Sequence, residues 1–139
     1  MTDLLLRTPF ADWTARRWVV AVLLVPVLLA WFARAGGSTD LVTVGGVPVW
    51  WGTLVIITAV TGSLVVAGYV PATGWRPDLG CTTCASVSAL TLLGATVALR
   101  SGAPGDPGSA ALAFAVVAFG LLQRVTAPAT CEVPAPDRG

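Results

Sequence analysis

Long uncharged apolar runs, separated by short segments rich in charge, glycine or proline, limit the fold of this chain more than any other feature. Hydrophobic residues make up 55% of the 139 residues, charged residues make up 11%, and the mean hydropathy is +0.82. A soluble domain carries about 25% charged residues, and small domains bury the smallest fraction of their surface. The composition therefore indicates that the solvent of this chain is a lipid bilayer.

Four of the apolar runs approach or reach the roughly 20 residues that a spanning helix requires. Only helices and closed barrels satisfy the backbone in lipid, so we expect an all-α membrane protein, a four-transmembrane-helix bundle. Where the first and last runs are short, Arg34 and Arg124 can extend their side chains toward the interface. The predicted spans are residues 18–35, 50–70, 81–99 and 108–125.

The segments outside the spans carry weaker signals. Alternating residues on both sides of Gly45 and Gly46 predict a short extracytoplasmic hairpin between the first two helices, with Pro48 at an edge. Residues 1–127 are expected to form one transmembrane domain. Residues 128–139 are rich in proline and are expected to be a disordered tail.

Charge sets the expected orientation. With four spans, six arginines fall on the side of both termini and two on the other, which favours cytoplasmic termini in the inner membrane. The six are Arg7, Arg16, Arg17, Arg76, Arg124 and Arg138, and the two are Arg34 and Arg100.

The basic residues also limit the partners. The net charge is +1, which provides no field for nucleic acid. The chain has neither lysine nor histidine, so Schiff-base and imidazole chemistry are excluded. Exclusive use of arginine is typical of a GC-rich bacterial genome.

Aromatic and small residues agree with this layout. All six tryptophans fall at predicted interfaces, where an amphipathic ring is most stable: Trp13, Trp18, Trp31, Trp50, Trp51 and Trp75. Small residues at intervals of four predict close helix packing, within the chain, with a second copy or with other membrane subunits. They include Ala59, Ser63, Ala67, Gly94 and Ala98. No charge lies deep inside a span, which argues against an ion-coupled transporter.

The one motif with chemical content is the CxxC pair Cys81 and Cys84, at the predicted start of the third helix. A helix amino terminus stabilises a thiolate, and Cys131 is expected at the same membrane face. The three thiols suit a soft metal ion or dithiol–disulfide exchange, and they also suit inert cysteines. In a reducing cytoplasm a structural disulfide is not expected.

Two resemblances follow from this motif. With the opposite orientation, the chain would resemble the quinone-linked disulfide-forming enzymes, including the vitamin K epoxide reductase type, which are four-helix bundles with a CxxC at a helix end. Over residues 81–127 it resembles uncharacterised small bacterial multi-span membrane proteins in which a CxxC opens a late helix. An aromatic residue expected after the second cysteine is absent, since Ser86 and Val87 stand there. The second resemblance implies no activity.

Three functional classes remain, and the first is favoured. It is a non-enzymatic accessory or scaffold component of a membrane complex. The second is a thiol site, which as an enzyme would be a membrane thiol–disulfide oxidoreductase. The third is a holin-like pore former, with polar residues lining a pore or bonding between helices: Thr58, Thr61, Ser63, Ser86, Ser88 and Thr91.

Overall fold

A computed structural model describes residues 13–37, 49–71, 74 and 82–126, without the side chains of residues 82–85 and 88. The described ranges contain four helices and no strand, which confirms the all-helical prediction. Most of the predicted hairpin segment and the tail lie outside these ranges. The helices are α1 (Ala15–Ala35), α2 (Val49–Ala67), α3 (Thr82–Ser101) and α4 (Pro107–Thr126).

Three of these helices, α1, α2 and α4, are long and apolar enough to cross a membrane. A helix of 20 residues rises about 30 Å, which equals the hydrocarbon thickness of a bilayer. Helix α3 has 20 residues, of which Ala89–Ser101 form the described apolar segment. Length and composition are thus compatible with a place in the membrane.

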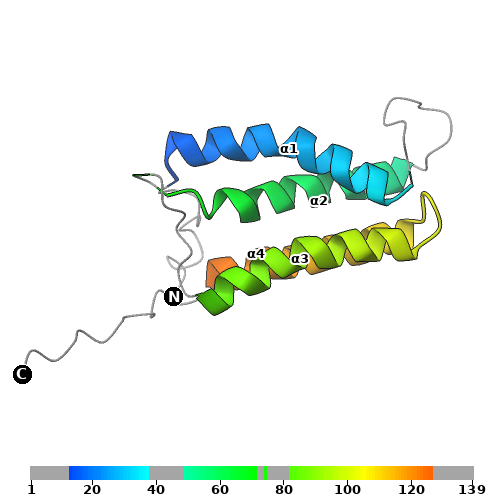
Figure 1. Ribbon diagram of the computed structural model, residues 1–139. Helices are drawn as coiled ribbons and strands as arrows, with labels where there is room; N and C mark the ends of the chain where they lie inside the picture. The colour runs from blue at the N-terminus through cyan, green and yellow to red at the C-terminus, as the bar shows by residue number, and fades with distance from the viewer. Residues whose placement is uncertain (1–12, 38–48, 72–73, 75–81, 127–139) are drawn as a thin grey trace, which may run out of the picture.

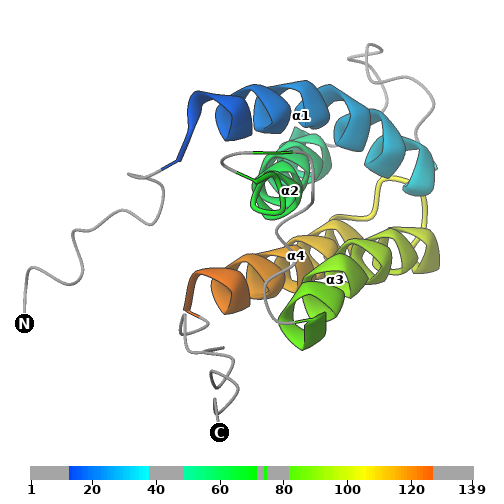
Figure 2. The same cartoon turned by 60° about the vertical axis from the view of Figure 1, so that its left-hand side comes forward.

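Consecutive helices run in opposite directions and form two layers, α1 with α2 above α3 with α4 (Figure 1). Helix α2 packs against both α1 and α4, whereas α3 packs mainly against α4 and meets α1 over a short stretch. The turned view shows α2 between α1 and the lower pair (Figure 2). We call the end where α1 and α3 begin the Arg17 end, and the end where they finish the Arg100 end.

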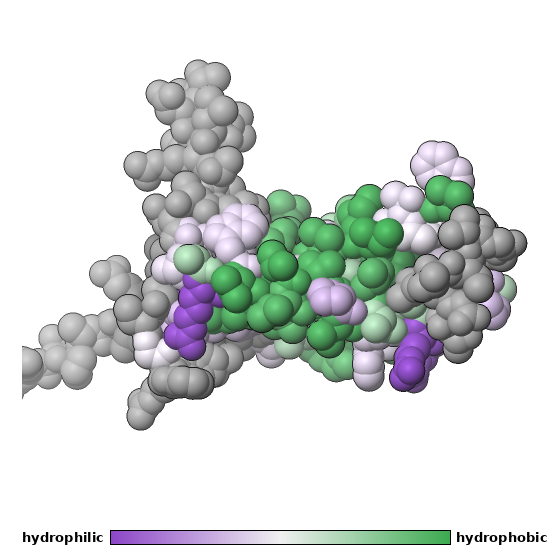
Figure 3. Space-filling view, turned by 90° about the horizontal axis from the view of Figure 1, so that it is seen from above, coloured by the Kyte–Doolittle hydropathy of each residue, from purple (hydrophilic) through white to green (hydrophobic). Residues whose placement is uncertain are grey.

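Small residues occupy most of the buried positions of this bundle. Among them are Ala59, Ala95, Ala110 and Ala113, each 0% exposed. Many large apolar side chains point outward, as Leu93 does at 61% exposure, although Trp51, Phe32 and Leu99 are buried. The upper face shows an apolar band between hydrophilic residues at its two ends (Figure 3). Water would penalise such a surface, whereas lipid tails would not.

Glycines mark the closest helix approaches. A Cβ added at Gly120 of α4 would lie 2.8 Å from Cγ2 of Thr91 in α3. At Gly62 of α2 an added Cβ would lie 3.0 Å from a methyl carbon of Leu92. The helices therefore meet at positions where the absence of a side chain permits contact.

The turn between α3 and α4 is defined by two residues. Gly105 adopts a φ of 77°, a left-handed conformation that other residues rarely adopt. Asp106 follows as the N-cap, and its Oδ2 accepts a hydrogen bond from the Ser109 backbone N–H at 2.8 Å. The negative charge of Asp106 is thereby placed at the positive end of α4.

The contact at Gly120 predicts the effect of adding one methyl group. Gly120→Ala should lower the free energy of unfolding by about 1–3 kcal/mol, because the new Cβ overlaps Thr91. Unfolding in mixed detergent micelles, followed by circular dichroism, measures the change.

Gly52→Ala is the matched control, since no atom lies within 4 Å of a Cβ added at Gly52 in α2. There alanine should be neutral or stabilising by up to about 1 kcal/mol through helix propensity. Thr91→Ala should recover part of the loss at Gly120. Equal stability of the two alanine variants would contradict the close approach of α3 and α4.

Candidate functional site

The cysteine motif lies at the edge of the described structure. Cys81 and Cys131 are outside the described residues, and Cys84 is described only as backbone in the first turn of α3. The structure therefore does not bring the three thiols together or separate them. Among the residues that it does describe, no group of three His, Cys, Asp or Glu side chains could hold a metal ion.

Three arginines surround the segment that follows α2 at the Arg17 end. Nε of Arg17 donates to the Val70 carbonyl at 2.7 Å, and Nη1 of Arg16 donates to the Gly74 carbonyl at 2.8 Å. Both arginines come from the first turn of α1. They thus tie the start of α1 to the chain that leaves α2.

Arg124, near the end of α4, holds the same segment from the other side. Its Nη2 donates to the Gly68 carbonyl at 2.8 Å, and its guanidinium carbon lies 4.1 Å from the centre of the Tyr69 ring. A guanidinium at this distance over a ring makes a cation–π contact. Arg124 therefore binds both the backbone and a side chain of the segment.

These contacts have a common electrostatic cause. The end of a helix is the negative end of its dipole, and the acceptors Gly68 and Val70 lie within three residues of Ala67, the last residue of α2. Helix α2 has no basic residue in its own last turn. Arg17 and Arg124, from α1 and α4, supply positive charge there instead. The site can hold a chain segment in place.

The arrangement was not predicted in this form. Sequence patterning used Arg16, Arg17 and Arg124 to orient the helices in the membrane and Arg124 to lengthen a short span, and it did not predict their contacts. The signal that was available is the position of these residues at the ends of helices that meet α2, next to an end of α2 that has no basic residue of its own. A single sequence does not show which ends meet.

The buried hydroxyls of the bundle are satisfied by their own helices. Thr58 donates to the Leu54 carbonyl at 2.7 Å, and Ser63 donates to the Val60 carbonyl at 2.8 Å. Both side chains are 1% exposed. These two residues, proposed from the sequence as pore-lining, thus lie in close-packed protein. Thr91, at 7% exposure, is also buried, whereas Thr61 is half-buried.

The residues expected to mediate packing also lie inside the bundle. Ala59 and Ala67 are 0% exposed, Ala98 is 6% exposed and Gly94 is half-buried. A Cβ added at Gly94 would lie 3.2 Å from Cγ1 of Val116 in α4. Together with Ser63, these positions serve contacts within the chain.

The tryptophans divide between surface and core. Trp13 and Trp18 lie together at the Arg17 end, with ring centroids 5.4 Å apart, and Trp50 is 77% exposed at the start of α2. Trp51, expected to be an interface anchor, is instead 1% exposed and packs with Phe32 and Leu99. Its Nε1 has no hydrogen-bond partner among the described residues. Trp75 lies outside the described residues.

The cause of this difference is the turn of the helix. Adjacent helical residues point about 100° apart, because a turn contains 3.6 residues. Trp50 therefore faces outward while Trp51 enters the bundle beside Gly36, where an added Cβ would lie 2.5 Å from the indole Cζ2. Trp51 is a core residue at the Arg100 end.

Comparison with known proteins adds no relative. No family model, curated protein or solved structure matches the chain.

The arginine contacts predict a local loss of protection at the end of α2. In Arg124→Ala the amides of Tyr69 and Val70 should exchange with deuterium about tenfold faster, because a charge-assisted hydrogen bond and a cation–π contact are lost. Hydrogen–deuterium exchange in detergent micelles measures this rate.

Arg124→Lys keeps the charge but not the planar guanidinium, so it should restore the protection only partly. Arg100→Ala removes an equal charge at the other end and should leave these amides unchanged. Unaltered exchange in Arg124→Ala would show that the contacts do not hold the segment.

Proposed function

We propose that this chain is a small multi-pass protein that crosses the inner membrane four times and acts as a non-enzymatic accessory component of a membrane complex. The observation that carries the proposal is that many large apolar side chains face outward along the helices, while small residues fill most of the interior. Val22, Leu90 and Val97 are each at least 60% exposed, on α1 and α3. A monomer in water rarely exposes apolar surface of this extent.

The positions of the arginines support a bundle that spans the bilayer. Arg16 and Arg17 lie at one end of α1 and Arg34 at the other, and 17 residues of helix rise about 26 Å. Arg100 and Arg124 lie at opposite ends of the α3–α4 pair. This placement of the arginines agrees with an α3 that crosses the membrane. The count of arginines on each side supports cytoplasmic termini.

The state of the polar side chains favours an accessory role over catalysis. A substrate site requires polar groups that converge on a pocket and remain available. In the described helices, Thr58, Ser63 and Thr96 instead donate to carbonyls of their own helices. The same bonds count against a pore through the bundle, because a pore would need these hydroxyls to face water. The outer surface is then the part that meets lipid, a second copy or another subunit.

A thiol site is the second candidate, supported by where α3 begins. The helix starts at Thr82, so Cys84 falls in its first turn. A CxxC at a helix start suits soft-metal binding or disulfide exchange. This alternative makes Cys84 essential, whereas the accessory role does not.

The two candidates differ in the response to removal of sulfur. The tagged chain, solubilised from its own membranes in mild detergent, should migrate on a native gel well above its 14.2 kDa mass after correction for detergent. The variant C81S/C84S/C131S should migrate in the same complex, because the assembly rests on helix surfaces.

Variants at surface positions locate the contact between this chain and its partners in the complex. Leu90→Ala and Leu112→Ala, at exposed positions of α3 and α4, test the outer faces without a cavity in the core. Migration as a monomer in every mild detergent would contradict the accessory role. Cys84→Ser is measured together with a companion variant, Cys131→Ala. Loss of the complex or of bound metal in Cys84→Ser would favour the thiol site.

A further inference from the structure

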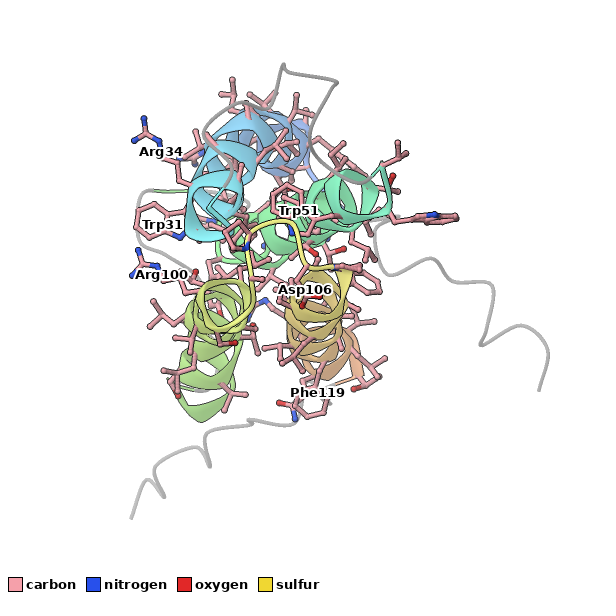
Figure 4. All side chains as sticks on the ribbon, turned by 90° about the vertical axis from the view of Figure 1, so that its right-hand side faces the viewer. Trp31, Arg34, Trp51, Arg100, Asp106 and Phe119 are labelled. Carbon is pink, nitrogen blue, oxygen red and sulfur yellow. The ribbon has the colours of Figure 1, made fainter. Side chains whose placement is uncertain are left out.

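The side of the bundle formed by α1 and α3 carries two cations at the Arg100 end. Trp31, Arg34 and Arg100 all lie along this side (Figure 4). Nε1 of Trp31 donates to Oγ1 of Thr96 at 3.2 Å, which places α1 and α3 side by side at this level. The hydrogen bond is therefore a fixed reference point for the arginines around it.

Both arginines lie at a similar height beyond that hydrogen bond. Arg34 follows Trp31 by three residues and Arg100 follows Thr96 by four, and the two helices run in the same direction. At 1.5 Å per residue, the two Cα atoms are displaced about 4.5 Å and 6 Å toward the Arg100 end. The guanidinium groups thus flank the exposed ring of Trp31 from two helices.

These charges differ from those at the Arg17 end. Arg16, Arg17 and Arg124 donate to backbone carbonyls, whereas the side chains of Arg34 and Arg100 are exposed and form no hydrogen bond or ion pair with another described residue. Asp106, the acid described at this end, caps α4. Asp40 lies outside the described residues.

An apolar strip continues from the two arginines toward the middle of the bundle. Two and three turns below Arg34 on the same face of α1 lie Val27 and Leu23, 61% and 64% exposed. Two turns below Arg100 on α3 lies Leu93, 61% exposed. Two cations above an apolar strip match the negative headgroup and the acyl chains of one lipid molecule.

We propose that the α1–α3 side binds an anionic phospholipid, with the phosphate held by Arg34 and Arg100 and the acyl chains along Val27 and Leu93. The inference rests on the membrane location in the proposed function. Arginine binds phosphate with two parallel hydrogen bonds, and the apolar strip selects a lipid over free phosphate. A zwitterionic headgroup is disfavoured, because it brings a positive charge of its own.

Quenching of Trp31 by brominated lipid tests the site. The full chain is reconstituted in phosphatidylcholine vesicles that contain a minor fraction of phosphatidylglycerol, with bromine on the chains of one lipid or the other. The fluorescence of Trp31 is obtained by subtracting the signal of the Trp31→Phe variant from the signal of the parent chain. Bromine on phosphatidylglycerol should quench the fluorescence of Trp31 as strongly as if the fraction of that lipid beside Trp31 were about tenfold its fraction in the whole bilayer. One charge-assisted hydrogen bond provides a preference of this size.

The variant R34Q/R100Q should remove this enrichment, whereas R7Q/R138Q, with the same net charge, should keep it. Inorganic phosphate should not displace the lipid; displacement would reduce the site to a free-anion site and overturn the proposal. Quenching in proportion to lipid composition would also overturn it, while leaving the membrane location intact. Absence of quenching by either brominated lipid would instead refute the membrane location itself.

Discussion

Close contact between small side chains is the constraint on which the rest of this structure depends. Lipid tails are as apolar as leucine, so helices in a bilayer gain nothing from hiding large apolar residues from their solvent. They gain instead from dispersion and from close approach, which alanine and glycine permit. Ala59, Ala95 and Ala113 lie in the interior, Gly120 meets Thr91, and the large residues Leu93 and Val97 point outward. The interior is therefore built mainly from small residues, with Trp51, Phe32 and Leu99 as its large members.

The polar groups follow from the same constraint. A hydroxyl or carbonyl removed from water must be bonded within the protein, since an unsatisfied group costs several kcal/mol. Thr58 and Ser63 meet this need along their own helix, and the carbonyls that follow α2 meet it through Arg17 and Arg124 from neighbouring helices. The arginines at the Arg17 end therefore stabilise the fold. Arg34 and Arg100, at the opposite end, remain available to a ligand of opposite charge.

The helices were predictable from the sequence, because apolar runs between charges require helical backbone in lipid, and each predicted boundary lies within one turn of the observed one. The side of a helix on which a given residue lies was harder to predict from the sequence. Trp50 and Trp51 are neighbours with the same chemistry, yet one is exposed and the other is buried. Packing against Phe32 decides this, and that contact joins residues on different helices. The contacts of Arg17 and Arg124 were missed for the same reason. The predicted thiol site at Cys81, Cys84 and Cys131 stays a prediction.

The measurement that tests the four crossings most directly compares two single cysteines in a chain without its native ones. Ala15→Cys, at the start of α1, and Ala103→Cys, between α3 and α4, are both at exposed positions. Intact and lysed cells are treated with a membrane-impermeant maleimide. Four crossings with cytoplasmic termini predict that Ala103→Cys reacts in intact cells and that Ala15→Cys reacts only after lysis. If both cysteines react under the same condition, an even number of crossings separates them, so α1, α2 and α3 do not all cross and the account is contradicted.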